Sequence, residues 1–307
     1  MAKTIKQVMK QGFVILNINT NELSFMNALN GEEPENDTID QTPTNANSRF
    51  SKSTQNKFNS RTANKAENNS IIVENTNLLP ISAKEFADLL GISIDKITSI
   101  HLQGSRLYGT LTDASDYDLM IVADHSGLRN YKPVEDRSVN RKHKFKEVVT
   151  KDGDIIQVHI YNQNEMAAHI NDHEITTIEF LFHPDSTKVL ERAVYNAKID
   201  KNKLVETVIN KSIENWDTAK FIINNNSDVY PGLKRVWHSL RHLIFAEQIL
   251  KDGTITDFSA ANYLYNGIVG KKTEIESKTI DFSFFEENYL PLRLELEARI
   301  KSLAAQQ

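Results

Sequence analysis

A Gly-Ser pair, Gly104-Ser105, precedes the triplet Asp116-Tyr117-Asp118 in this chain. The β-branched run at residues 97–102 ahead of the pair predicts a strand that runs into a glycine turn. Glycine lets backbone N–H groups approach an anion closely, and a serine hydroxyl adds one more donor. The pair therefore predicts a phosphate cradle at the end of a strand.

The two aspartates lead into the apolar residues 119–122, which predict a second strand. Because residues i and i+2 of a strand share a face, Asp116 and Asp118 are expected to point the same way. Paired carboxylates are hard oxygen ligands, of the kind that hold Mg²⁺ against a triphosphate. Each motif alone is usually a turn or a solvated strand end, but their ordered pairing indicates a site for a nucleoside triphosphate (NTP) with Mg²⁺ or Mn²⁺.

This pattern resembles the signature of the DNA polymerase beta-like nucleotidyltransferase superfamily, in the spacing of the minimal nucleotidyltransferases. Tyr108-Gly109 and Ser115 fit it, and later segments resemble blocks of an uncharacterised bacterial and phage branch, namely 154–161, 177–184 and 234–241. The matches cover about residues 95–270. The resemblance implies transfer of a nucleoside monophosphate from an NTP to an acceptor hydroxyl, with release of pyrophosphate.

The resemblance also implies roles for individual residues. Asp116 and Asp118 would bind the metal and act in catalysis, while Gly104, Ser105 and the adjacent Arg106 would bind phosphates. The acceptor stays open between an RNA end, a protein side chain and a small hydroxylated molecule.

One position departs from the superfamily pattern. A third carboxylate is normally found on the strand after Asp-x-Asp, and here the best-matching residue on the strand expected at 155–161 is Gln157. Glutamine cannot take a proton from a hydroxyl and is a poor Mg²⁺ ligand. Asp154, Glu147 and His159 are alternative replacements, although Asp154 fits better in a hairpin turn between two strands.

A basic stripe is expected on a helix over about residues 232–250. Lys234, His238 and Arg241 fall at i, i+4 and i+7, so they share one face. Such a stripe suits charge neutralisation on a triphosphate, or it is a solvated basic face. Trp237 is expected in the core.

A second group of basic residues lies between the Asp-x-Asp strand and the next hairpin. It either guides nucleic-acid phosphates toward the cleft or forms a solvated loop. Its members are Arg137, Arg141, Lys142, His143, Lys144 and Lys146.

Composition sets the limits of these readings. The 307 residues are 39% hydrophobic and carry a net charge of −5, which argues against a general nucleic-acid coat. The chain has no cysteine and no apolar run long enough for a membrane span or a secretory signal, so we expect a cytoplasmic location and no membrane contact.

The chain is expected to have an α+β fold in four parts. A short N-terminal element (1–30) and an Asn/Ser/Thr-rich disordered linker (31–78) precede a nucleotidyltransferase domain with a small mixed sheet (79–184) and a helical domain (185–307). Helices are expected at about 187–197, 203–224, 232–250, 258–269 and 290–303, and a capping box at Ser82 begins another.

Two alternatives to an enzyme remain. The loss of a carboxylate at Gln157 is compatible with a non-catalytic regulator that binds a nucleotide or RNA. In the second alternative, the protein is an interaction module whose residues 1–78 dock to a protein partner.

Overall fold

The computed structural model describes residues 73–75, 77–113, 115–137, 139–225 and 228–306, all within one compact unit. The element expected at 1–30 and most of the linker expected at 31–78 lie outside the described residues. The end of that predicted linker, however, forms a short strand, β1 (Val73–Glu74), which joins the edge of the sheet.

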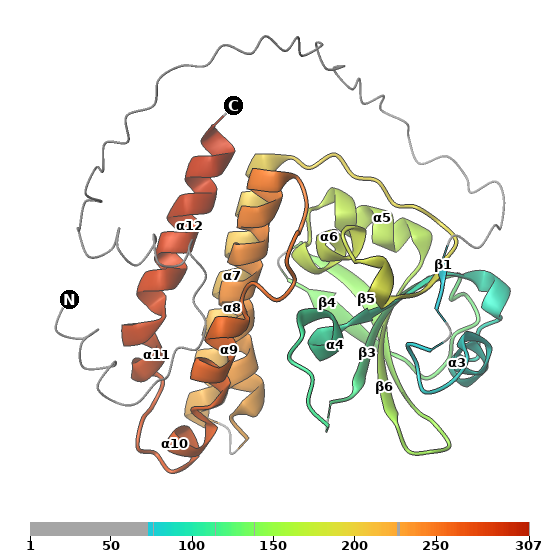
Figure 1. Ribbon diagram of the computed structural model, residues 1–307, viewed down its shortest axis with the longest axis horizontal. Helices are drawn as coiled ribbons and strands as arrows, with labels where there is room; N and C mark the ends of the chain where they lie inside the picture. Colours follow the sequence, from blue (N-terminus) through green and yellow to red (C-terminus); the bar gives the residue numbers. More distant parts are fainter. Residues whose placement is uncertain (1–72, 76, 114, 138, 226–227, 307) are drawn as a thin grey trace, which may run out of the picture. The chain divides into compact units, whose positions relative to one another are not determined.

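Within the described residues, seven strands form one mixed sheet in the order β1-β7-β2-β3-β6-β5-β4 (Figure 1). Strands β3 and β6 run parallel, and the other paired strands are antiparallel. The further strands are β2 (Ile97–Gln103), β3 (Tyr117–Ala123), β4 (Lys132–Asp136), β5 (Arg141–Val149), β6 (Ile155–Tyr161) and β7 (Lys188–Glu191).

The two faces of the sheet enter different apolar cores. On β3, Leu119 and Ile121 join the core that includes helix α3 (Ala83–Leu90), whereas Met120 and Val122 join the core built with the C-terminal helices. This alternation is the strand period of two, and it places Asp116 and Asp118 on the side of the C-terminal helices. The mixed sheet and the helices that follow confirm the predicted α+β class.

The helices that position the site follow the strands closely. The short α4 (Gly104–Tyr108) leaves β2 directly, and α5 (Gln163–Asn171) and α6 (Ile175–Leu181) follow β6. Figure 1 shows α7, α8 and α12 side by side. The C-terminal helices are α7 (Lys201–Asn225), α8 (Tyr230–Asp252), α9 (Asn262–Val269), α10 (Lys272–Glu276), α11 (Ser283–Asn288) and α12 (Leu290–Ala305).

Local signals located several of these elements correctly. Ser82 and Glu85 form the predicted reciprocal capping box at the start of α3. The helix expected over 187–197 is wrong: residues 185–187 are a 3₁₀ turn (Asp185–Thr187), and β7 then adds to the sheet beside β2. The apolar residues of this short run are buried by strand pairing, which periodicity alone does not reveal.

Candidate nucleotide site

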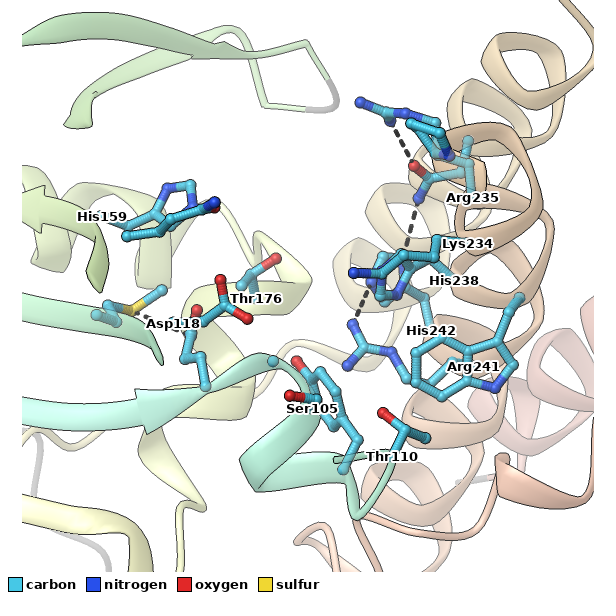
Figure 2. Close-up of a pocket in the computed structure, with 18 of the residues that line it drawn as sticks. Ser105, Thr110, Asp118, His159, Thr176, Lys234, Arg235, His238, Arg241 and His242 are labelled. Carbon is cyan, nitrogen blue, oxygen red and sulfur yellow. Dashed lines mark hydrogen bonds between the residues drawn. The ribbon is translucent and has the colours of Figure 1, made fainter. Parts of the chain in front are cut away.

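A cleft of about 830 Å³ opens between the sheet and helices α7 and α8. It is lined by the end of β2, by α4, by β3 to β6, by the start of α6 and by residues of α7, α8 and α9. Figure 2 shows Asp118 and His159 on the sheet side facing Lys234, His238 and Arg241 on α8. Eight of the nine residues predicted for the site line this cleft, namely Gly104, Ser105, Asp116, Asp118, Gln157, Lys234, His238 and Arg241.

Gly104 and Asp118 touch closely where β2 ends. Gly104 has a φ of +61°, in the left-handed region that favours glycine. A Cβ atom at this position would lie 2.7 Å from Cγ of Asp118 and nearer still to its Oδ2. Only glycine therefore lets the chain turn into α4 beside this carboxylate, and Ser105 follows at the start of α4.

Asp118 and Gln157 lie opposite each other in the parallel ladder of β3 and β6. Gln157 donates a hydrogen bond from Nε2 to Oδ2 of Asp116, over 3.2 Å. Burial raises the pKa of Asp118, the positive charge of Lys234 opposes that rise, and the negative charge of Asp116 adds to it. The site thus holds two adjacent carboxylates and one amide at the position of the third.

The alternatives to Gln157 lie in three different settings. Asp154 is in the β5–β6 turn, where its backbone N–H and side chain bond Thr150. Glu147 is directly across from Gln157 on β5, on the same face of the sheet, but it is exposed and does not line the cleft. His159 lines the cleft, and burial lowers its pKa to about 4.

The basic stripe on α8 is less cationic than its sequence suggests. Burial lowers the pKa of His238 to about 3, so this imidazole is neutral at pH 7 and cannot neutralise a phosphate. The charge of Lys234 opposes the rise in the pKa of Asp118, and the Lys234 Nζ lies 5.5 Å from the centre of the Tyr230 ring. Trp237 is 1% exposed and donates from Nε1 to the Ala261 carbonyl, as expected for a core residue.

Arg241 is 2% exposed and bridges the cleft to the core. Its Nη2 is 3.4 Å from Oε1 of the buried Glu179, and its guanidinium stacks 3.7 Å from the centre of the Tyr108 ring. Tyr108 in turn donates from Oη to Oε2 of Glu179, over 2.7 Å. Burial, and then the negative charge of Glu174, raise the pKa of Glu179. Two nitrogens of Arg241, Nε and Nη1, have no partner in the described part of the chain.

The position of Arg106 differs from the prediction that this side chain binds phosphates in the cleft. Arg106 does not line the cleft, because its guanidinium lies over the ring of Tyr117, 3.6 Å from the ring centre. A planar cation stacks well on an aromatic face, and the tyrosine between the two aspartates provides that face. The sequence shows the arginine next to the phosphate cradle but not the direction of its side chain.

The basic residues of β5 also differ from expectation, since they form a strand and not a loop. Lys144 and Lys146 alternate with Phe145, which lies across from His159 on the cleft face, so both lysines point to the opposite face. Lys146 donates to the Leu90 carbonyl at the end of α3. These lysines therefore do not lead into the cleft.

The same cleft also contains a group of acidic side chains that the sequence did not predict. Asp136 ends β4, Glu174 caps α6 and Glu214 lies on α7. Lys211 of α7 contacts Asp136 over 2.9 Å and Glu214 over 3.1 Å. These residues are far apart in the chain, and no local sequence motif links them.

The carboxylate pair fits a divalent cation that is completed by a triphosphate. Mg²⁺ is commonly bound through one or two carboxylates together with substrate phosphates and water. Asp116 and Asp118 supply two carboxylates on one strand face, beside the Gly104 turn. In the described residues, no group of three or more histidine, aspartate or glutamate side chains is placed to hold a metal without such a substrate.

A glycine turn at a strand end, paired carboxylates on the next strand and cations on a facing helix form the arrangement expected of a nucleotide-dependent transferase. Residues 83–226 match the family model of the nucleotidyltransferase domain, so the chain contains such a domain. This confirms the resemblance drawn from the Gly-Ser and Asp-x-Asp motifs at the level of the domain family. The assignment to the minimal type and its phage branch stays a prediction.

Two solved structures are similar to this chain at low identity. A nucleotidyltransferase-like protein from Exiguobacterium sibiricum is 14% identical, covering 72% of this chain and 71% of its own, with a TM-score of 0.23. An aminoglycoside 6-adenyltransferase from Bacillus subtilis is 10% identical, covering 69% and 86%, with a TM-score of 0.22. No curated protein matches the chain.

None of the helices described is long and apolar enough to cross a membrane.

Proposed function

We propose that this protein transfers a nucleoside monophosphate from an NTP to an acceptor hydroxyl and releases pyrophosphate. The supporting observation is that the Gly104 turn, both aspartates and the cations of α8 line one cleft, whose sheet side belongs to the nucleotidyltransferase domain matched at residues 83–226. In this reaction the acceptor oxygen bonds to the α-phosphorus, the bond from that phosphorus to the bridging oxygen breaks, and the hydroxyl proton passes to a base.

Each set of residues has a defined part in the proposal. The backbone at Gly104 and the hydroxyl of Ser105 would hold the β- and γ-phosphates, because the turn brings donors close to the carboxylates. Lys234 and the unpartnered nitrogens of Arg241 would neutralise the charge that develops on the leaving pyrophosphate. His238, being neutral, would donate at most one hydrogen bond.

Asp116 and Asp118 would hold Mg²⁺ or Mn²⁺ together with phosphate oxygens. A divalent cation bound there supplies charge neutralisation at the transferred phosphoryl group. Gln157 fixes Asp116 through its hydrogen bond but cannot serve as the base.

Label transfer tests the proposal directly. The pure protein is incubated with each α-labelled NTP, Mg²⁺ or Mn²⁺, total RNA and cell lysate. We expect label on one acceptor class and a loss of at least about a hundredfold in Asp118→Asn, because removing one charge-stabilising group typically costs this much. The matched control is Asp113→Asn, at an exposed aspartate in the loop before the motif that does not line the cleft.

Equal transfer by wild type and Asp118→Asn would contradict the assigned site. The amide at Gln157 supports the rival proposal of a non-catalytic nucleotide binder. Metal-dependent NTP binding with no transfer under any condition would favour that rival.

The third proposal is that residues 1–78 dock to a protein partner. Pulldown of a partner by that segment alone would support it. Normal partner binding after deletion of the segment would contradict it.

A further inference from the structure

The guanidinium of Arg241 belongs to a buried network that joins three helices. Its Nη2 lies 3.4 Å from Oε1 of Glu179 on α6 and donates to Nε2 of His242 over 2.9 Å. Its Cζ lies 3.7 Å from the centre of the Tyr108 ring on α4. Arg241 is 2% exposed, Glu179 0% and His242 4%. These contacts fix both the direction and the plane of the guanidinium.

The network uses only part of a group that has five N–H donors. Nη2 carries two of them, while Nε and Nη1 carry the other three. Nε and Nη1 are buried and have no partner among the described residues. Figure 2 shows the Arg241 side chain pointing from α8 toward the sheet side of the cleft. Leaving buried donors unpaired costs free energy, which an anionic ligand in the cleft would recover.

Tyr108 connects this network to the proposed phosphate cradle. It is the last residue of α4, a helix of five residues that begins at Gly104. Its Oη donates to Oε2 of Glu179 over 2.7 Å, and its carbonyl accepts from Nδ2 of Asn262 over 2.6 Å. One end of α4 thus forms the cradle, and the other end supplies the ring on which Arg241 stacks. This short helix holds the cradle and the guanidinium at a fixed spacing.

From these contacts we infer that Glu179 and Tyr108 are positioning residues for Arg241. By holding Nη2 and the plane of the group, they direct Nε and Nη1 at the pyrophosphate that leaves when the acceptor attacks. Charge on this leaving group grows in the transition state, where donors that are already in place are most effective. The inference rests on the proposed nucleotidyl transfer and adds two residues that act through Arg241.

Glu179→Gln probes the network with little change of shape. The single oxygen of the glutamine amide must accept from Oη of Tyr108. Its NH2 group then takes the place of Oε1 and faces Nη2 of Arg241, so that two donors meet. The guanidinium therefore loses its partner on α6 and its fixed direction.

Inorganic pyrophosphate with Mg²⁺ is the probe, because it binds without any transfer reaction. By calorimetry on the full-length protein at pH 7, we expect Glu179→Gln to weaken binding about fivefold and Tyr108→Phe about threefold. The matched control, Glu297→Gln, breaks a buried pair on α12 outside the cleft. There Nη2 of Arg293 lies 3.3 Å from Oε1 of Glu297, and both residues are 8% exposed. This control should bind pyrophosphate as the wild type does.

A double-variant cycle separates positioning from general structural damage. Arg241→Gln alone should weaken pyrophosphate binding at least about tenfold, and Glu179→Gln should add nothing in that background, because no guanidinium is left to position. A purely structural role of Glu179 would lower the affinity by the same factor in both backgrounds. Circular dichroism verifies folding, and Tyr108→Phe, which keeps the stacked ring, replaces Glu179→Gln in the cycle if the latter does not fold. Equal losses in both backgrounds, or wild-type affinity in the single variants, overturn the inference.

Transfer kinetics with α-labelled NTP test the proposed reaction separately. We expect Glu179→Gln to lower kcat by a larger factor than it raises KM for the NTP, because the leaving-group charge develops after the substrate has bound. Coupled pyrophosphate binding without transfer to any acceptor would uphold the positioning and reject the reaction. Transfer by a protein whose pyrophosphate binding shows no coupling between residues 179 and 241 would overturn the positioning and leave the reaction standing.

Discussion

Gly104 and Asp118 are in such close contact that no side chain fits between them: a Cβ atom at residue 104 would overlap the carboxylate of Asp118. The contact joins the end of β2 to the start of β3, which pair as antiparallel neighbours with Gln103 across from Asp118. The proposed phosphate cradle and one proposed metal ligand therefore cannot shift independently.

We expect Gly104→Ala to abolish transfer, because the alanine must displace Asp118 and also adopt a left-handed φ, which alone costs about 1–2 kcal/mol. Metal-dependent NTP binding and label transfer would both be measured. Gly127→Ala is the matched control, since Gly127 is exposed and a Cβ there meets nothing within 4 Å. Normal activity in Gly104→Ala would show that the cradle lies elsewhere.

Gln157→Asp is expected to raise the transfer rate and the affinity for Mn²⁺. The substitution places a third carboxylate on β6 across from Asp118, at a position where the present amide can neither accept a proton nor ligate well. Glu147→Gln should have little effect, because Glu147 does not line the cleft. If Gln157→Asp leaves the rate unchanged while Glu147→Gln lowers it, Glu147 is the functional replacement.

Tyr108→Phe should destabilise the protein by about 1–3 kcal/mol, because the buried carboxylate of Glu179 loses its hydroxyl donor. Urea unfolding followed by circular dichroism would measure the change. Tyr131→Phe is the control. Because Tyr131 is exposed, removing its hydroxyl should change the free energy of unfolding by no more than about 0.5 kcal/mol. Equal stabilities of the two variants would mean that the Tyr108–Glu179 contact does not contribute.

Glu174 gives a prediction about pH. Burial, and then the negative charge of Asp136, raise the pKa of Glu174 from 4.5 to about 7, although Lys211 opposes the rise. Between these two values the folded protein binds the proton more tightly than the unfolded chain does. The contribution of Glu174 to stability is thus fully present below pH 4.5 and is lost as the pH rises through 7.

Glu174→Gln removes this titration. Relative to wild type, its Tm should rise between pH 5 and pH 8, whereas any fixed loss at the helix cap would be the same at both pH values. The exposed Glu287 provides the control variant, Glu287→Gln, for which no such change is expected. Parallel Tm curves for wild type and Glu174→Gln would show that Glu174 titrates normally.

The sequence alone determined the parts of this protein that depend on local rules. The strands on both sides of the Gly-Ser motif, the capping box of α3 and the long helices α7 and α8 follow from residue periodicity and from hydrogen bonds between near neighbours. The motif itself identified the domain family, because the required residue types stand close together in the chain.

Only the tertiary structure decided which distant residues share the cleft. Strand pairing set Gln157 across from Asp118, turned a stretch expected to be helical into β7 and directed the lysines of β5 away from the site. Burial lowers the pKa of His238, so this ring is neutral at pH 7. The side chain of Arg106 stacks on the Tyr117 ring and does not line the cleft. Asp136, Glu174 and Glu214 reach the cleft from β4, the start of α6 and α7, and no local pattern encodes contacts between such separated elements.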